Sequence, residues 1–196
     1  MPSISAKYDA NNADASGDQY GFRKATLEDS PAIIELQNRL GKEEDFLVAT
    51  PIDPFTGASL LRASLQTGGA LGPSCVIVAD YRGQIVGLIL CRDHLHPFLR
   101  GMVQLALCVD KHHRRRGVGS SLLSKAIEWA EDAGIRRLQL AVIANNTAAL
   151  ATYRKMDFEI EGTLNSAAVI RGIPFDLHIM ARQVLPRLRR GIRSAV

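Results

Sequence analysis

The chain has 196 residues, of which 46% are hydrophobic, and a formal net charge of +4 at pH 7. This length is enough for one substantial core and is short for two domains. The three cysteines, Cys75, Cys91 and Cys108, lie among apolar residues and are odd in number, which argues against a disulfide framework or a metal site. Without a secretory leader or an apolar run of membrane-spanning length, the sequence predicts a soluble, cytoplasmic protein.

The first part of the chain changes from a polar arm to a strand and a helix. Residues 1–20 are small and polar, and we expect a flexible arm. A short strand follows, and then a helix with Thr26 at its N-cap and Asp29 in the capping-box position. Its apolar residues recur at helical spacing, at Ile33, Ile34, Leu36 and Leu40. Residues 41–73 are rich in Gly, Pro and Thr around a weaker helical stretch, so the pattern does not determine their boundaries.

The remaining chain alternates apolar strands with two helices. Residues 75–93 contain two apolar β-branched runs separated by a turn at Gly83, which predicts a hairpin. A strand is expected over 102–110, and an amphipathic helix then runs to Gly134, which provides a C-terminal stop. The last expected elements are a strand over 136–143, a helix beginning near Asn146, and two strands over 158–163 and 175–182.

This order of elements predicts one α/β (α+β) domain over residues 21–184, followed by a basic tail at 185–196. We expect a mixed, mostly antiparallel sheet with helices on both faces. The helix that joins strand 102–110 to strand 136–143 makes that pair parallel. Exposed sheet edges would permit a homodimer.

The run "KHHRRRGVGSSLL", residues 111–123, joins a predicted strand to a predicted helix. A glycine-containing loop there presents backbone N–H groups beside the positive end of the helix dipole, which favours phosphate oxygens. Arg114, Arg115 and Arg116 would add charge-assisted contacts. The run lacks the third glycine of a dinucleotide fingerprint and the GK[ST] of a Walker loop. A solvated basic turn is the plain alternative, and a nucleic-acid patch lacks interleaved aromatic residues.

Two motifs in the chain resemble those of the GNAT N-acetyltransferase superfamily. "RRRGVG", Arg114 to Gly119, is similar to its R/Q-x-x-G-x-G/A signature, and "NTAALATYRKMDF", Asn146 to Phe158, resembles its N-x-x-A-x-x-x-Y-x-K-x-G-F motif. Asp157 departs from the usual glycine, but a left-handed turn accepts Asp. The resemblance covers roughly residues 22–182, and the final part is similar to the bacterial branch that acts on amino acids and small amines.

The resemblance implies a sheet that splays between its fourth and fifth strands and binds acetyl-CoA there, with no metal. The arm of acetyl-CoA would bond like an added strand. The implied cofactor-binding residues come from the strand before the basic run, from the loop and helix start, and from the second motif. They are Leu107, Cys108, Val109, Arg114, Arg115, Arg116, Gly117, Val118, Gly119, Ser120 and Asn146. His112 and His113 would flank the phosphates, and Asn146 could equally be a helix N-cap.

Tyr153 matches the tyrosine of the second motif and is the expected catalytic residue, a general acid that protonates the departing CoA thiolate. Many relatives carry a glutamate as base where this chain has Gln104, which cannot accept a proton at neutral pH. Other candidates that could activate the amine through water lie near the third strand and in the last strand. They are Asp93, His94, His96, Asp176 and His178.

The leading hypothesis is therefore acetyl transfer from acetyl-CoA to a primary amine of a small molecule, by direct attack in a ternary complex. An alternative is acetylation of a protein N-terminus or lysine, which requires an open acceptor groove. A third, of another class, is a non-catalytic module that binds CoA or nucleic acid, which the missing glutamate and the basic tail would favour.

Overall fold

A computed structural model describes residues 12–13, 19–43, 74–93 and 96–185. Several predicted features therefore lie outside the described residues: most of the arm, the helical stretch within 41–73, His94, and the basic tail after residue 185. Tyr20, assigned to the arm from sequence, belongs to the second strand and is only 1% exposed. The described domain thus begins before Tyr20.

The described strands form one sheet in the order β1-β2-β3-β4-β5-β6-β8-β7. They are β1 (Asn12–Ala13), β2 (Gln19–Lys24), β3 (Cys75–Tyr81), β4 (Gln84–Asp93), β5 (Met102–Val109), β6 (Arg137–Ile143), β7 (Glu159–Ile170) and β8 (Ile173–Gln183). Every neighbouring pair is antiparallel except β5 and β6, which are parallel. The predicted mixed, mostly antiparallel sheet is confirmed.

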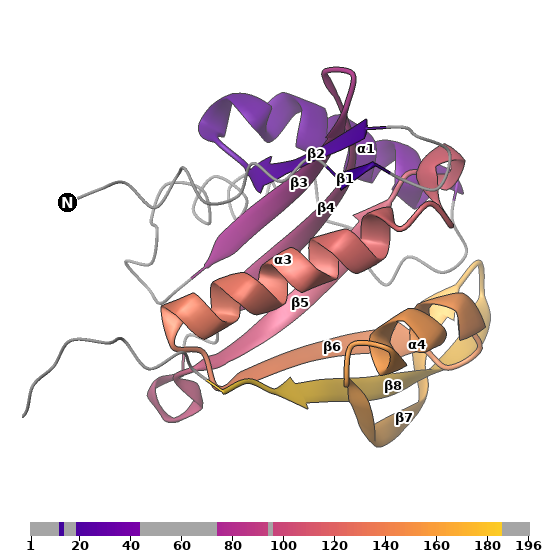
Figure 1. The fold of residues 1–196 in the computed structure, drawn as a ribbon. Coiled ribbons are helices and arrows are strands. Elements are labelled where there is room, and N and C mark those ends of the chain that lie inside the picture. Colours follow the sequence, from indigo (N-terminus) through magenta and orange to yellow (C-terminus); the bar gives the residue numbers. More distant parts are fainter. Residues whose placement is uncertain (1–11, 14–18, 44–73, 94–95, 186–196) are drawn as a thin grey trace, which may run out of the picture.

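Helices cover both faces of this sheet, as expected. The helix α3 (Val118–Ala133) and the helix α4 (Thr147–Arg154) contribute Leu122, Leu150 and neighbouring apolar residues to a large core on one face. The helix α1 (Ser30–Glu43) packs Ile33, Leu36 and Leu40 on the other face, against β3 and β4. Figure 1 shows α3 lying along the middle of the sheet and α4 beside β6 and β8. No described helix has the length and apolarity needed to cross a bilayer.

The sheet opens between β5 and β6, the fourth and fifth strands counted from β2. Their parallel pairing covers only three positions, from Met102 opposite Arg137 to Gln104 opposite Gln139. Beyond Gln104 the two strands diverge toward their carboxyl ends (Figure 1). This confirms the predicted splay and leaves one edge of the second half of β5 without a neighbour among the described strands.

Two local predictions differ from the structure. Thr26 and Asp29 form a capping box, but it starts a 3-10 turn at Leu27–Asp29, and α1 itself begins at Ser30. The last hairpin is longer than its apolar pattern indicates, because Arg171 and Gly172, with φ of 50° and 79°, make a tight turn that lets both strands extend to it.

The ion pair between Arg23 and Asp29 makes the stability of this domain sensitive to acid. Two guanidinium N–H groups donate to the Asp29 carboxylate at 2.6 and 2.8 Å, and mainly for this reason the pKa of Asp29 falls to about 2. Its stabilisation is complete above the unfolded pKa near 4 and disappears as the pH falls through about 2. We expect wild type to lose about 1 to 2 kcal/mol more stability than Asp29→Asn between pH 5 and 2, by urea unfolding. Equal losses would contradict this assignment.

Candidate active site

The second half of β5 turns one set of backbone groups toward the splay. The Asp110 N–H donates to the Val86 carbonyl at 2.8 Å, continuing the regular antiparallel ladder between β5 and β4. Because backbone groups alternate in direction along a strand, those of Cys108 also point to β4. Those of Leu107 and Val109 point the other way, to the side where pairing with β6 has stopped. Leu105 shares this direction, but its N–H belongs to the last step of the parallel pairing at Gln104 and Gln139, so only its carbonyl faces the open side. This edge can hydrogen-bond an extended ligand.

This alternation refines the sequence prediction, which named the three consecutive residues 107–109. The backbone groups of Cys108 point to β4, whereas those of its two neighbours point to the open side. The alternation adds the carbonyl of Leu105, a residue that the sequence analysis did not name and that lies at period-two spacing from Leu107. The Val109 carbonyl, at the mouth of the splay, accepts from Arg114 Nε at 2.9 Å.

The basic run folds into a loop with two left-handed residues. A 3-10 turn, Lys111–His113, follows β5, and Arg115 and Gly117 then have φ of 57° and 82°. Arg114, Arg115 and Arg116 are exposed. When left-handed residues occur within a loop, successive backbone N–H groups point to the same side. These N–H groups form a concave site for an anion.

The start of α3 offers unused hydrogen-bond donors next to this loop. The first helical bond runs from the Ser121 N–H to the Gly117 carbonyl, and no side chain caps the helix. The N–H groups of Val118, Gly119 and Ser120 therefore remain for a ligand. A side-chain carbon at Gly119 would lie 3.7 Å from Val109 Cγ2, so the helix begins directly against the end of β5. These residues fit a pyrophosphate followed by an extended arm.

Tyr153 lies near the C-terminal end of α4 and is 8% exposed. Burial, with a smaller contribution from the neighbouring Cys108, raises the pKa of Tyr153 to about 12, and burial likewise raises the pKa of Cys108 to about 12. Its ring lies 6.0 Å from that of Phe158. In the described part of the chain the hydroxyl has no hydrogen-bond partner, so it stays available to a ligand near β5.

Asn146 is the N-cap of α4, because its side-chain oxygen accepts from the Ala149 N–H at 3.1 Å. The helix-capping interpretation of this residue is confirmed. The cap fixes the start of the helix that carries Tyr153, and the two amide hydrogens of the side chain are not used by it.

The residues weighed as bases lie in different environments. Gln104 lies where the sheet begins to open, and its side-chain oxygen accepts from Gln139 Nε2 at 3.4 Å. Asp93 ends β4 and is buried, whereas His96 caps an exposed 3-10 turn. On β8, His178 contacts the Thr163 hydroxyl at 2.9 Å, and Asp176 accepts from the Ser166 N–H at 2.7 Å. The structure does not bring these groups into one cluster with Tyr153.

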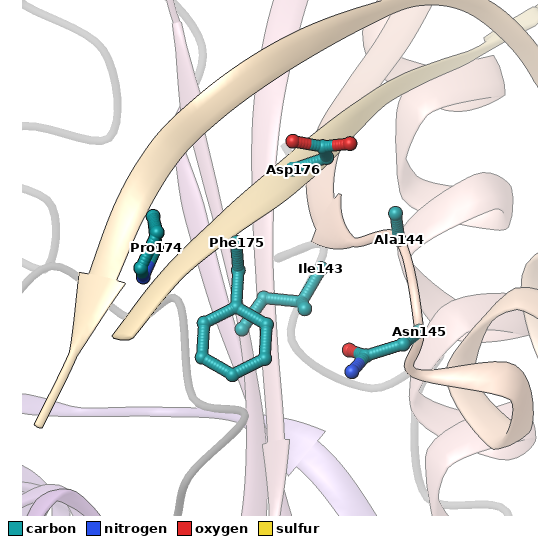
Figure 2. A pocket seen from close by; sticks show the side chains of 6 residues that line it. All are labelled: Ile143, Ala144, Asn145, Pro174, Phe175 and Asp176. Carbon is teal, nitrogen blue, oxygen red and sulfur yellow. The ribbon is translucent and has the colours of Figure 1, made fainter. Parts of the chain in front are cut away.

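A pocket of about 250 Å³ lies at the carboxyl end of β6, between the start of α4 and β8. Its walls are Ile143, Ala144, Asn145, Pro174, Phe175 and Asp176. In Figure 2 the Phe175 ring and the Asn145 amide border the same space, and the Asp176 carboxylate points away from the ring. The pocket therefore combines an apolar wall with the amide of Asn145, whereas the Asp176 carboxylate is engaged by the Ser166 N–H. Within the described residues, no cluster of side chains suits a metal.

The basic run has a second set of contacts that sequence spacing could not show. The Tyr20 hydroxyl lies 3.0 Å from His113 Nδ1, and Arg39 of α1 forms an ion pair with Asp110 at 2.6 Å. The sequence analysis assigned His113 to the phosphates and gave Asp110 no role. These contacts join residues 93 and 71 positions apart, so no local pattern could have revealed them.

A mixed sheet that opens beside an uncapped helix start, with a buried tyrosine near its edge, is the arrangement of an N-acetyltransferase. Comparison with known sequences agrees. The model of the acetyltransferase (GNAT) family matches residues 45–158, and the chain belongs to this family. The resemblance found from the two motifs is thereby confirmed.

Relatives from several bacteria show the range of this family. The L-amino acid N-acetyltransferase AaaT of Escherichia coli is 33% identical over 54% of this chain and 66% of its own length. The L-methionine sulfoximine/L-methionine sulfone acetyltransferase of Pseudomonas aeruginosa is 27% identical over 84% of this chain and 95% of its own. The solved ribosomal-protein-alanine N-acetyltransferase of Brucella melitensis has a TM-score of 0.73 and 27% identity, covering 83% and 99% of the two chains.

Proposed function

We propose that this protein transfers the acetyl group of acetyl-CoA to a primary amine of a small molecule, such as an amino acid. The observation that carries the proposal is the run of unused N–H groups at the start of α3, directly against the unpaired edge of β5. An anion site that continues into an open strand edge suits a pyrophosphate joined to an amide-containing arm. The named activities of the amino acid relatives support an amino acid acceptor.

Each part of acetyl-CoA has a proposed partner. The pyrophosphate is bound by Arg115, Arg116 and the N–H groups from Gly117 to Ser120, while Arg114 also holds the Val109 carbonyl at the mouth of the splay. Backbone groups of Leu107 and Val109, together with the carbonyl of Leu105, bond the arm. Cys108 contributes through its position near Tyr153. Asn146 caps α4, and its amide N–H groups extend the same surface.

Acetyl-CoA supplies the acetyl group, and CoA then leaves as a thiolate that needs a proton. Tyr153 donates that proton from its hydroxyl, and the proton that the amine nitrogen loses as the amide forms restores the hydroxyl. A pKa of about 12 keeps the phenol protonated at neutral pH, and a thiolate in the same buried region is also strongly basic, as the Cys108 thiol with its pKa of about 12 illustrates. Burial therefore raises the pKa of both the Tyr153 hydroxyl and the CoA thiol, so the free-energy change of the proton transfer between them stays small.

Gln104 accepts no proton, so we propose that the acceptor amine reacts from its neutral fraction without a dedicated base at this position. The neutral fraction of an amine rises with pH, reaches one half at the pKa of the amine and levels off above it. The rate should therefore follow the ionisation of the acceptor, while Tyr153 stays protonated.

Acetylation of a protein N-terminus is the second candidate, supported by the likeness to the ribosomal-protein-alanine N-acetyltransferase. We rank the small acceptor first because the amino acid acetyltransferase of Pseudomonas aeruginosa matches 84% of this chain; the pocket at the end of β6 would admit either a free amino acid or the first residue of a protein.

The test is the release of free CoA thiol from acetyl-CoA in the presence of single amino acids, other small amines, or peptides. We expect turnover with at least one amino acid, and mass spectrometry of the product should show one added acetyl group on its amine. Turnover with peptides alone would favour the second candidate. Binding of CoA without turnover across the whole panel would contradict catalysis and leave a CoA-binding module.

A further inference from the structure

Asp110 is a buried carboxylate at the point where β5 ends and the basic loop begins, with 11% of its side chain exposed. Both of its oxygens are engaged. Oδ1 accepts the His112 N–H at 2.9 Å and so caps the 3-10 turn that leads into the loop. Oδ2 accepts from Arg39 Nη2 at 2.6 Å. One side chain therefore shapes the start of the loop and connects it to α1.

The negative charge of this carboxylate is unfavourable beside a site that binds an anion. Arg114 follows Asp110 only four positions later, and the loop there is the proposed site of a doubly charged pyrophosphate. A buried negative charge near a bound anion repels it, because the local dielectric constant is far below that of water. The cap itself needs only an oxygen that accepts a hydrogen bond, which an uncharged amide also provides.

Arg39 supplies the compensating charge from the opposite face of the sheet. It lies on the second half of α1, and its Nε is buried without a hydrogen-bond partner in the described part of the chain. In the position that binds Asp110, the guanidinium therefore leaves its Nε–H unsatisfied, which lowers the stability of the fold. An arrangement that costs stability suggests a role other than stability.

We propose that Arg39 is a positioning residue for acetyl-CoA: it neutralises Asp110, so that this carboxylate can cap the loop without repelling the pyrophosphate. The inference rests on the proposed function, because it needs the loop to bind CoA. It predicts that removing the positive charge weakens binding, whereas removing the negative charge does not. A purely structural ion pair predicts that either removal weakens binding.

The experiment titrates CoA into the purified proteins by calorimetry, which needs no turnover. Arg39→Met should weaken CoA binding about tenfold, because it leaves the Asp110 charge uncompensated. Asp110→Asn keeps an oxygen for the His112 N–H and frees the Arg39 charge, so it should bind CoA as tightly as wild type or more tightly. The double variant Arg39→Met/Asp110→Asn should return to within about threefold of wild type.

Two controls separate charge from folding. Arg23→Met breaks the remote ion pair with Asp29, and it should lower the unfolding midpoint without changing CoA affinity. Arg39→Lys keeps the charge and should bind CoA nearly as wild type does, even if Arg39→Met folds poorly. Equal weakening by Arg39→Met and Asp110→Asn, or a double variant no better than Arg39→Met, would overturn the inference alone. A wild-type protein that does not bind CoA would overturn the proposed function as well.

Discussion

Tyr153→Phe is expected to lower kcat by about 10²- to 10⁴-fold while the KM for acetyl-CoA stays within about twofold, the range for loss of a general acid. The substitution removes only the hydroxyl. That hydroxyl makes no hydrogen bond to a described residue. The ring remains packed against Phe158, with 6.0 Å between the two ring centroids. The loss should therefore appear in the chemical step and not in folding. Steady-state kinetics with acetyl-CoA and a saturating acceptor measures both parameters.

Phe158→Leu is the matched control, because it disturbs packing beside Tyr153 and leaves the hydroxyl in place. It should lower stability and change kcat only slightly. The wild-type pH profile gives an independent check: with a pKa of about 12, Tyr153 stays protonated up to pH 10, so kcat should rise with the neutral amine and not fall in this range. A fall in kcat between pH 8 and 10, or an equal change of kcat and KM in Tyr153→Phe, would contradict its role.

The sequence predicted the parts of the site that depend on local pattern. The apolar spacing from Val118 to Ala130 and the stop at Gly134 gave α3 correctly, and with it the helix start that follows the basic run. The parallel pairing of β5 and β6 followed from the helix between them. The second motif placed Tyr153 on a helix, where its burial agrees with the apolar face of α4.

The parts that sequence missed depend on direction or on distant contacts. Nothing in the letters of β5 tells which of Leu107 and Cys108 turns its backbone toward the splay, because that parity is set by pairing with β4. The ion pair of Arg39 and Asp110 forms only when α1 packs on the sheet. The length of β7 depends on the turn at Arg171, a residue whose positive φ its identity does not favour.

Gly117→Asp is expected to raise the KM for acetyl-CoA on the order of 100-fold with a much smaller change in kcat. A side-chain carbon at this position would meet nothing within 4 Å, so the cost of the change is the strain of a side chain at a φ of +82° and the new charge. At the N-cap of α3 the new carboxylate would bond the helix N–H groups that we assign to the pyrophosphate, and it would add a negative charge to that site. The left-handed backbone should cost some stability in this variant, and the matched variant Gly117→Asn shares that cost.

Gly117→Asn separates these two effects, because Asn adopts the left-handed φ of 82° about as readily as Asp and caps a helix similarly, yet it carries no charge. It should raise the KM for acetyl-CoA by about tenfold, between wild type and Gly117→Asp. Higher salt should reduce the gap between the two variants, since screening weakens the repulsion. If both variants kept the wild-type KM, the start of α3 would not be the pyrophosphate site. If both lost stability and kcat together, the glycine would serve the fold of the loop and not the ligand.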